Sequence, residues 1–344
     1  MRYAPDAPEV QETLTMIRRL CDNPALPNLR NYLQHVDVQE EAAHEILRQI
    51  FEDISSMTEQ EAGTLAAALD AESINGLDDI LLFEQHIDAY TFLPNIVSDA
   101  ELGRFLADTG FIHVSAEVEP YINYAGLGAS YYDAHGGAYG PKGYALRTQT
   151  VNDTFKAAVF STECEIPAYV ILPMSDVYAE KLQAQLGVSR TCDIQLIAVE
   201  AKDRRFGEFL AMLDADCTTL RDMNELTNRL LDMQKTDGEY LKFLSALEAE
   251  QVSTFPGALA VARNLDDYTR FTGDLEEYGR SVLERMGTPK NAIDSIEGYM
   301  DLEDFGRVMM REDDVRQTQY GLIRKDWGDD FPQQKQTMTM GGMT

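Results

Sequence analysis

The chain has 344 residues and a formal net charge of −30, because 59 acidic side chains accompany only 29 basic ones. A hydrophobic content of 44% excludes wholesale disorder, and an acidic surface repels nucleic acid and anionic membranes while it attracts basic surfaces. The four cysteines are widely spaced, the N-terminus has no apolar leader, and no apolar run approaches the roughly 20 residues that span a bilayer. The sequence therefore predicts a cytoplasmic protein with no membrane role.

The first 147 residues predict a series of helices. Apolar residues recur at helical spacing over about 9–21 and again in VQEEAAHEILRQIFEDI (38–54). Thr58, followed three residues later by Glu61, has the form of a capping box for the next helix. Two further helices are predicted in GLDDILLFEQHIDAYTF (76–92) and SDAELGRFLAD (98–108).

The periodicity changes between residues 154 and 200. TFKAAVFS, IPAYVILP and CDIQLIAVEA predict three strands, and SDVYAEKLQAQLG predicts a capped helix that ends at Gly187. Together they indicate a small α/β domain. Beyond Asp326 the sequence has neither periodicity nor core residues, which predicts a flexible tail.

The sequence also repeats itself at a spacing of 178 residues. EPYINYAGLG (119–128) aligns with EGYMDLEDFG (297–306), and after a slip of two residues ELGRFL (101–106) aligns with EYGRSV (277–282). Because chance similarity rarely keeps one register over about ninety residues, this pattern indicates an internal duplication.

These observations predict an α+β fold: an elongated multi-domain chain of small helix-rich modules, two of them repeats, around a small α/β domain with a three-stranded sheet. The predicted segments are an acidic repeat at 1–147, the α/β domain at 148–221, a second acidic repeat at 222–325 and the tail at 326–344. The two repeats carry net charges of −16 and −8, against −4 and −2 for the α/β domain and the tail. Most of the excess charge is therefore predicted on folded helices.

No motif supports catalysis. GGAYGPKGY (136–144) has no Ser or Thr after Lys142 and leads into a strand, so it predicts a glycine-built turn and not a phosphate loop. The histidines lack zinc-site spacing, and neither Cys164 nor GLGAS (126–130) lies in a nucleophile motif. The sequence predicts a protein that is not an enzyme, with no catalytic residue, no cofactor and no metal.

The acid pattern itself is the candidate function. Carboxylates fixed every few residues along helices approach the charge density of duplex DNA, which carries one negative charge per about 1.7 Å. The alternative is an acidic face that only keeps the protein soluble. The predicted partner-binding acids are Asp78, Asp79, Glu84, Asp88, Asp99, Glu101, Glu117 and Glu119 in the first repeat, and Asp266, Asp267, Asp274, Glu276, Glu277, Glu284, Asp294, Glu297, Asp301, Glu303 and Asp304 in the second. In the same stretch of the second repeat, the apolar and aromatic residues that lie between these acids are predicted to form the core: Tyr268, Leu275, Tyr278, Val282, Tyr299 and Phe305.

The C-terminal half resembles a known family. LRDMNELTNRLLDM, FLSALEAEQVSTFPGALAVARNLDDY, DLEEYGRSVLERMG and IEGYMDLEDFGRVM, closing on YGLIRK, resemble in order and spacing the ArdA-type antirestriction proteins of mobile elements. The preceding FKAAVFSTECEIPAYVILP to CDIQLIAVEA is similar to that family's small N-terminal α/β domain. Residues 151 to about 325 thus resemble a whole family unit, and 13–147 the same unit without its first domain.

The resemblance implies a non-enzymatic DNA mimic, commonly a homodimer, that occupies the basic DNA-binding groove of a Type I restriction-modification enzyme and binds no nucleic acid itself. In that family the segment matched by Tyr299 to Gly306, and by Tyr121 to Gly128, is tied to antirestriction and dimerisation. The first repeat departs from the pattern because YINYAGLG carries no acid, and a duplicated chain already supplies two mimic units. Another defence target, such as an RNA-guided nuclease, stays open, as does a nucleoid or conjugation factor bound by an acidic interaction protein.

Overall fold

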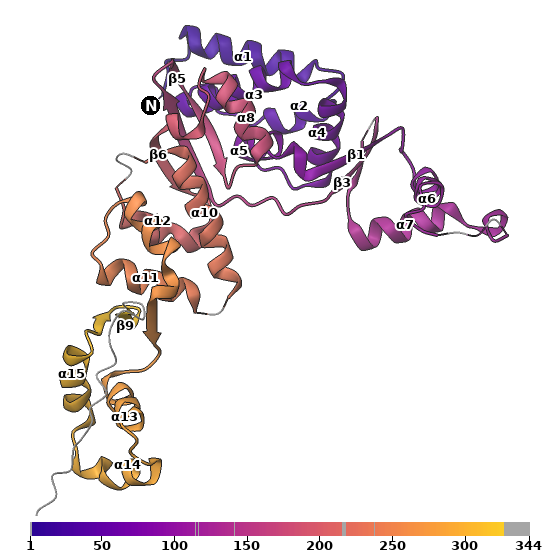
Figure 1. The fold of residues 1–344 in the computed structure, drawn as a ribbon. Coiled ribbons are helices and arrows are strands. Elements are labelled where there is room, and N and C mark those ends of the chain that lie inside the picture. Colours follow the sequence, from indigo (N-terminus) through magenta and orange to yellow (C-terminus); the bar gives the residue numbers. More distant parts are fainter. Residues whose placement is uncertain are drawn as a thin grey trace, which may run out of the picture. The chain divides into compact units, whose positions relative to one another are not determined.

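Helices dominate the structure. The computed structural model describes residues 2–326 except 114, 116, 141, 215–217 and 237 (Figure 1). In this part of the chain, fifteen α-helices accompany three antiparallel sheets of three strands each, which confirms the predicted α+β class. The chain divides into two compact units, Met1–Leu210 with Cys217–Asn224, and Ala211–Asp216 with Glu225–Thr344.

Five helices open the first unit and bury one shared apolar core. The predicted capping box is confirmed, because the Thr58 side chain accepts a hydrogen bond from the Glu61 main chain and Glu61 in turn accepts one from the Thr58 main chain. Leu47, Ile50 and Leu65 are completely buried in this core. The helices are α1 (Pro8–Cys21), α2 (Leu29–Leu33), α3 (Glu41–Ser56), α4 (Glu59–Ala71) and α5 (Leu77–Gln85).

The α/β domain in the same unit has the three predicted strands and the predicted helix. Phe155, Ala157 and Val159 alternate along the central strand and are fully buried, so one face of the sheet is core. The strand order is β5-β4-β6. The elements are β4 (Phe155–Ser161), β5 (Cys164–Leu172), α8 (Asp176–Gln185), η3 (Thr191–Asp193), β6 (Gln195–Ala201), η4 (Arg204–Phe206) and α9 (Gly207–Ala211).

A second small sheet and a helical lobe complete the first unit. The sheet has the order β1-β3-β2, and two helices, α6 and α7, pack against each other beside it (Figure 1). The elements are η1 (Ile87–Ala89), β1 (Tyr90–Pro94), α6 (Asp99–Asp108), η2 (Glu119–Tyr121), α7 (Tyr124–His135), β2 (Ala138–Gly140) and β3 (Gly143–Arg147).

The second unit repeats that plan. Helices lead into a sheet of order β7-β9-β8, and a helical lobe is inserted in the chain between β7 and β8. The elements are α10 (Leu220–Lys235), of which the residues from Glu225 on belong to this unit, α11 (Glu239–Ala249), α12 (Phe255–Arg263), η5 (Leu265–Asp267), β7 (Tyr268–Phe271), α13 (Leu275–Arg285), α14 (Lys290–Ile296), η6 (Glu297–Tyr299), α15 (Leu302–Glu312), β8 (Arg316–Thr318) and β9 (Gly321–Lys325).

The duplication extends to strand register. Tyr90 lies opposite Arg147, and 178 residues later Tyr268 lies opposite Lys325. The tyrosine hydroxyl in each pair donates a hydrogen bond to the C-cap glutamate of an earlier helix, Glu72 after α4 at 2.9 Å in the first repeat and Glu250 after α11 at 3.4 Å in the second. The two repeats therefore share topology, register and a polar contact.

Paired glycines set the helix packing in both lobes. A methyl group added at Gly103 or Gly128 would overlap the main chain of the facing helix in the α6–α7 pair. The same holds for Gly279 and Gly306 in the α13–α15 pair. These glycines lie in the segments that align between the repeats, so the duplicated sequence encodes close main-chain contact between two helices.

Of the predicted core residues of the second repeat, Tyr268, Tyr278 and Val282 are buried. Leu275 and Phe305 are half-buried and pack against the cluster that contains Tyr278 and Val282. Tyr299 is 94% exposed, so its assignment to the core is wrong. In the described part of the chain, no helix has the length and apolar character needed to cross a membrane. The predicted tail lies outside the described residues apart from Asp326.

Candidate partner-binding surface

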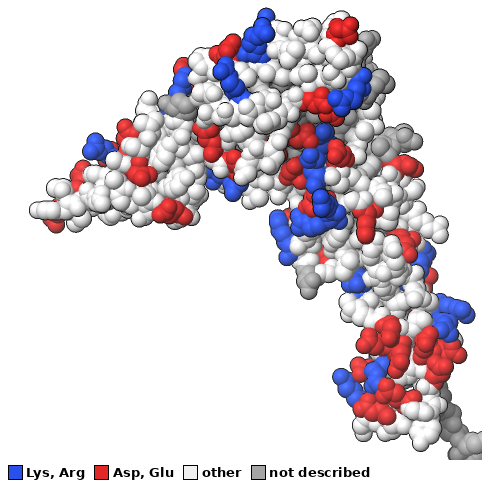
Figure 2. Space-filling view, turned by 180° about the vertical axis from the view of Figure 1, so that it is seen from behind, with Lys and Arg blue, Asp and Glu red and all other residues white. Residues whose placement is uncertain are grey.

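Each repeat presents an acidic helical lobe. The first lobe, residues 98–135, contains six acids and one arginine, and the second lobe, residues 274–314, contains twelve acids and five Lys or Arg residues. Figure 2 shows the carboxylates gathered over the second lobe at the foot of the view and spread more thinly over the first. The second lobe therefore has the stronger concentration of carboxylates.

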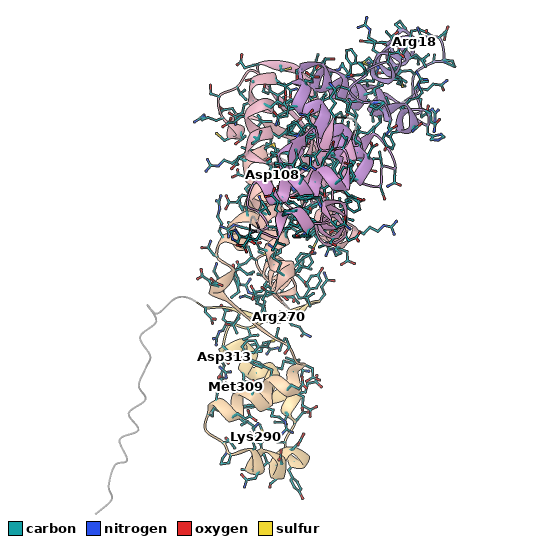
Figure 3. The ribbon with its side chains drawn as sticks, turned by 90° about the vertical axis from the view of Figure 1, so that its right-hand side faces the viewer. Arg18, Asp108, Arg270, Lys290, Met309 and Asp313 are labelled. Carbon is teal, nitrogen blue, oxygen red and sulfur yellow. The ribbon has the colours of Figure 1, made fainter. Side chains whose placement is uncertain are left out.

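The second lobe extends away from its own sheet. In Figure 3, Arg270 of β7 lies at the sheet end, Asp313 and then Met309 follow along the lobe, and Lys290 of α14 lies at the opposite end. The 3-10 helix η6, which ends at Tyr299, follows α14 directly in the chain.

Two acids of this lobe begin its main helices. The side chain of Asp274 accepts a hydrogen bond from the Glu277 main chain at 2.9 Å and caps α13. Asp301 caps α15 in the same way through the Asp304 main chain, also at 2.9 Å. A carboxylate suits a helix N-terminus because it satisfies a free N–H and faces the positive end of the helix dipole. These two acids are structural as well as charged.

Other acids of the second lobe are paired within it. Arg280 bridges Asp294 at 2.9 Å and Glu297, and these hydrogen bonds raise its pKa above the ordinary arginine value. Arg307 pairs with Glu303 at 2.6 Å and with Asp304. A looser pair, 3.7 Å long, joins Lys290 to Glu284. The pairs hold carboxylates in place, but they also cancel part of the charge that a partner would meet.

An acidic groove lies where this lobe meets its sheet. It has a volume of about 340 Å³ and is lined by Asp274 and Glu276 from the start of α13, by Glu303 from the start of α15, and by the β8–β9 hairpin. Glu276 is exposed and makes no ion pair among the described residues, so its charge is available to a ligand. The first lobe has Ser98, Ala100 and Ala125 at the aligned positions, which leaves the groove acidic only in the second repeat.

The predicted acids of the first lobe are placed differently. Asp99 accepts a hydrogen bond from the Tyr139 hydroxyl at 2.7 Å, and burial together with this contact raises the tyrosine pKa. Glu101 accepts a 2.8 Å hydrogen bond from the Val97 main chain at the start of α6. Glu117 is exposed shortly before η2, and Glu119 is exposed as its first residue. Only part of this predicted set thus offers free charge.

Asp78 and Glu84 do not belong to this surface, which corrects their assignment to the binding face. Asp78 is bridged by Lys156 at 3.0 Å and by Lys202 at 2.6 Å, both from the α/β domain. Glu84 is 1% exposed and pairs with Lys181 at 2.6 Å. Both carboxyl groups thus contact lysines inside the first unit and are not part of an outward acidic face.

The other predicted acids outside the two lobes are scattered. Asp79 accepts a hydrogen bond from the Asn75 main chain at 2.6 Å near the start of α5, and Asp88 is half-buried in η1. Asp266 and Asp267 are exposed in η5, directly before β7. The structure does not gather these four acids with the lobe carboxylates.

Exposed apolar side chains in and next to η2 and η6 of the two lobes were not predicted. Tyr121 is 86% exposed and Tyr299 is 94% exposed, at positions 178 residues apart. Three residues before each, Val118 and Ile296 are 54% and 38% exposed. The sequence did contain a signal for these exposed residues: both aligned segments, 119–128 and 297–306, have a tyrosine two residues before a helix N-cap. Exposed tyrosines amid acids combine apolar contact area with a polar hydroxyl, a combination that is frequent at protein interfaces.

Comparison with known proteins assigns no family to this chain: no family model, no curated protein and no solved structure matches it. Within the described residues, no group of three or more His, Cys, Asp or Glu side chains is arranged to hold a metal ion. The candidate site is therefore defined by its charge and its shape.

Proposed function

We propose that the protein is a DNA-mimic inhibitor, without enzymatic activity, that occupies the basic DNA-binding groove of a host defence nuclease. A Type I restriction-modification enzyme is the first candidate target, because the sequence resembles ArdA-type antirestriction proteins. The observation that carries the proposal is the concentration of exposed carboxylates on a lobe that is built twice in one chain.

The physical basis is competition for the same cationic groove. A protein that binds duplex DNA places Lys and Arg against a dense row of phosphates and gains affinity by releasing counterions. Carboxylates fixed on short capped helices engage those cations with little loss of side-chain freedom on binding, because helix caps and intra-lobe ion pairs already hold them.

The test is competition with duplex DNA for the methyltransferase core of a Type I enzyme in about 0.1 M salt, where surface charges still act over a Debye length of about 10 Å. The full chain should displace the duplex, and its affinity should fall steeply as salt is added. A chain that leaves the duplex bound at every concentration contradicts this target.

A paired variant tests the groove. Replacing both groove glutamates, Glu276→Gln and Glu303→Gln, should weaken competition by about thirtyfold or more, because close charge pairs across an interface each contribute on the order of 1 kcal/mol or more and every 1.4 kcal/mol is about tenfold. The matched control, Glu163→Gln with Glu180→Gln, removes two exposed acids of the α/β domain and should leave competition unchanged. An equal loss in both variants would show that only overall charge matters.

The interaction-protein alternative gives a different result in the same experiments. If the partner is a basic nucleoid or conjugation factor, the chain should capture that protein and fail to displace DNA from restriction or RNA-guided enzymes. A ranking of the chain's affinities for these partners, measured at one fixed salt concentration, distinguishes the two functions.

A further inference from the structure

Two carboxyl groups are buried where three helices of the first unit meet. Asp53 comes from α3 and Glu84 from α5, and their side chains have no exposed surface. They face α8 of the α/β domain, which contributes Lys181. This junction therefore joins the first repeat to the α/β domain through charged groups that are removed from water.

Hydrogen bonding at the junction is incomplete when both carboxyl groups are ionised. The Lys181 ammonium group lies 2.6 Å from Glu84 Oε1 and 3.4 Å from Asp53 Oδ1, and Gln185 donates to Asp53 Oδ1 as well. The remaining oxygens, Asp53 Oδ2 and Glu84 Oε2, are buried and have no hydrogen-bond donor among the described residues. A buried oxygen without a donor is costly and requires an explanation.

The charges do not balance either. Two carboxylates and one ammonium leave a net charge of −1, and Lys181 is the only cationic side chain that lines the adjoining cavity of about 300 Å³ in the described part of the chain. The other ionisable groups that face the junction are Glu61 of α4, Asp88 of η1 and the buried hydroxyl of Tyr178 on α8. None of them adds a positive charge.

One proton resolves both problems. Asp53 and Glu84 lie within hydrogen-bonding reach of each other, so a proton between them supplies the missing donor and makes the group of three side chains neutral. Burial, and then the nearby Asp53 carboxylate, raise the pKa of Glu84 to about 8. Such a group stays protonated at pH values where an exposed glutamate is ionised.

We propose that Asp53 and Glu84 share one proton and that this protonated pair, closed by Lys181, is a latch that holds α8 against α3 and α5. Loss of the proton leaves two facing carboxylates with one counter-charge, so α8 loosens from the helical repeat. The second repeat has Leu231 and Ala262 at the aligned positions, and it therefore lacks this latch.

The direction of the pH dependence follows from the raised pKa of Glu84. The latch contributes its full stability below the ordinary glutamate pKa of about 4.5 and loses it as pH rises through about 8. Opening of α8 should therefore become up to about tenfold more favourable for each pH unit across that interval, the limit for release of one proton.

Hydrogen exchange of the α8 amides in the full chain, corrected for the intrinsic pH dependence of exchange, tests the latch between pH 5 and 9. In the wild type, protection of α8 should fall as pH rises. Glu84→Gln, whose amide donates permanently, should flatten that profile, whereas the control Glu180→Gln, an exposed acid on α8, should keep the wild-type slope. Parallel profiles for the wild type and Glu84→Gln would overturn the proposal.

A second measurement does not depend on the variant folding. A carbon-13 titration of the wild-type carboxyl groups should show one that titrates near pH 8, well above the ordinary glutamate pKa. Titration of every carboxyl group below about pH 6 would overturn the shared proton and with it the latch.

Discussion

The side-chain amide of Gln49 forms two hydrogen bonds with the main chain of Tyr169: its Nε2 donates to Tyr169 O at 2.9 Å, and its Oε1 accepts from Tyr169 N at 2.7 Å. Gln49 belongs to α3, and Tyr169 lies on β5, one of the two outer strands of the α/β sheet. The glutamine thus takes the place of a neighbouring strand.

A second glutamine extends this arrangement along the same edge. Gln85 of α5 donates to Tyr169 O at 2.8 Å and accepts from Ile171 N at 2.8 Å. An open sheet edge is a template for unwanted pairing with another chain. Here two helices of the first repeat close that edge with side-chain amides, so the first repeat and the α/β domain are tied by hydrogen bonds as well as by apolar packing.

Removing one of these amides should be costly. Gln49→Met keeps the size of the side chain but leaves the Tyr169 main-chain groups and the Tyr178 hydroxyl with fewer partners. At about 1–3 kcal/mol for each buried group left unsatisfied, we expect the free energy of unfolding of the first unit to fall by about 2–4 kcal/mol. Urea denaturation measures this loss. Gln11→Met, at an exposed position of α1, is the control and should change the free energy by less than about 0.5 kcal/mol.

The paired glycines of the second lobe give a prediction about packing. Gly279→Ala places a methyl group against the main chain at Leu302, and Gly306→Ala does so at Leu275. Forcing α13 and α15 apart should lower the free energy of unfolding by about 1–3 kcal/mol per substitution, as in other overpacked sites. Gly298→Ala is the control because open space surrounds Gly298. If all three variants unfold alike in urea, the close helix contact is not needed for stability.

Sequence reasoning succeeded where the determining contacts are local. The capping box at Thr58 and the alternation along β4 depend on residues a few positions apart, and both were predictable. It failed for Asp78 and Glu84, because the lysines that compensate them lie 78 to 124 residues away in the chain. The local sequence around an acidic residue on a helix is the same whether that side of the helix faces water or packs against another domain. The prediction for Tyr299 was wrong in the opposite sense, because this residue was assigned to the core and is exposed. An aromatic residue at helical spacing resembles a core residue in the sequence, and the turn of the chain at η6 is not visible there.

Asp78 should therefore affect stability and not partner binding. Burial alone would raise its pKa, but hydrogen bonds from Lys202 and Lys156 outweigh that effect and lower it. A lowered pKa means that the contact stabilises the fold above the ordinary aspartate pKa, about 3.9, and is lost as pH falls below it.

The variant Asp78→Asn tests that assignment. It should lower the free energy of unfolding at pH 7 by about 2–4 kcal/mol, because it leaves two partly buried lysines without their carboxylate, and this deficit should shrink toward pH 3. Thermal unfolding at the two pH values measures the difference. Competition with DNA by the folded variant should equal that of the wild type, and a loss of competition would return Asp78 to the binding surface.

The helix caps of the second lobe allow charge and structure to be separated. The first repeat caps its corresponding helices with the uncharged Ser98 and Asn123, so Asp274→Ser with Asp301→Asn transfers the caps of one repeat to the other. Both replacements retain a side-chain oxygen that accepts from the helix N-terminus. We expect the free energy of unfolding to change by less than about 1 kcal/mol, whereas Asp274→Ala with Asp301→Ala should lower it by about 2 kcal/mol, about 1 kcal/mol for each lost cap. Urea denaturation distinguishes the two variants.

The same pair of variants separates a binding role of these carboxylates from a purely structural one. If Asp274 and Asp301 contact a basic groove, the Ser/Asn variant should lose competition with duplex DNA by severalfold and its affinity should depend less steeply on salt, although its stability is nearly that of the wild type. If they only cap α13 and α15, the Ser/Asn variant should compete as well as the wild type. A loss of competition confined to the Ala/Ala variant would therefore remove these two acids from the binding surface and leave it to the exposed, unpaired carboxylates such as Glu276.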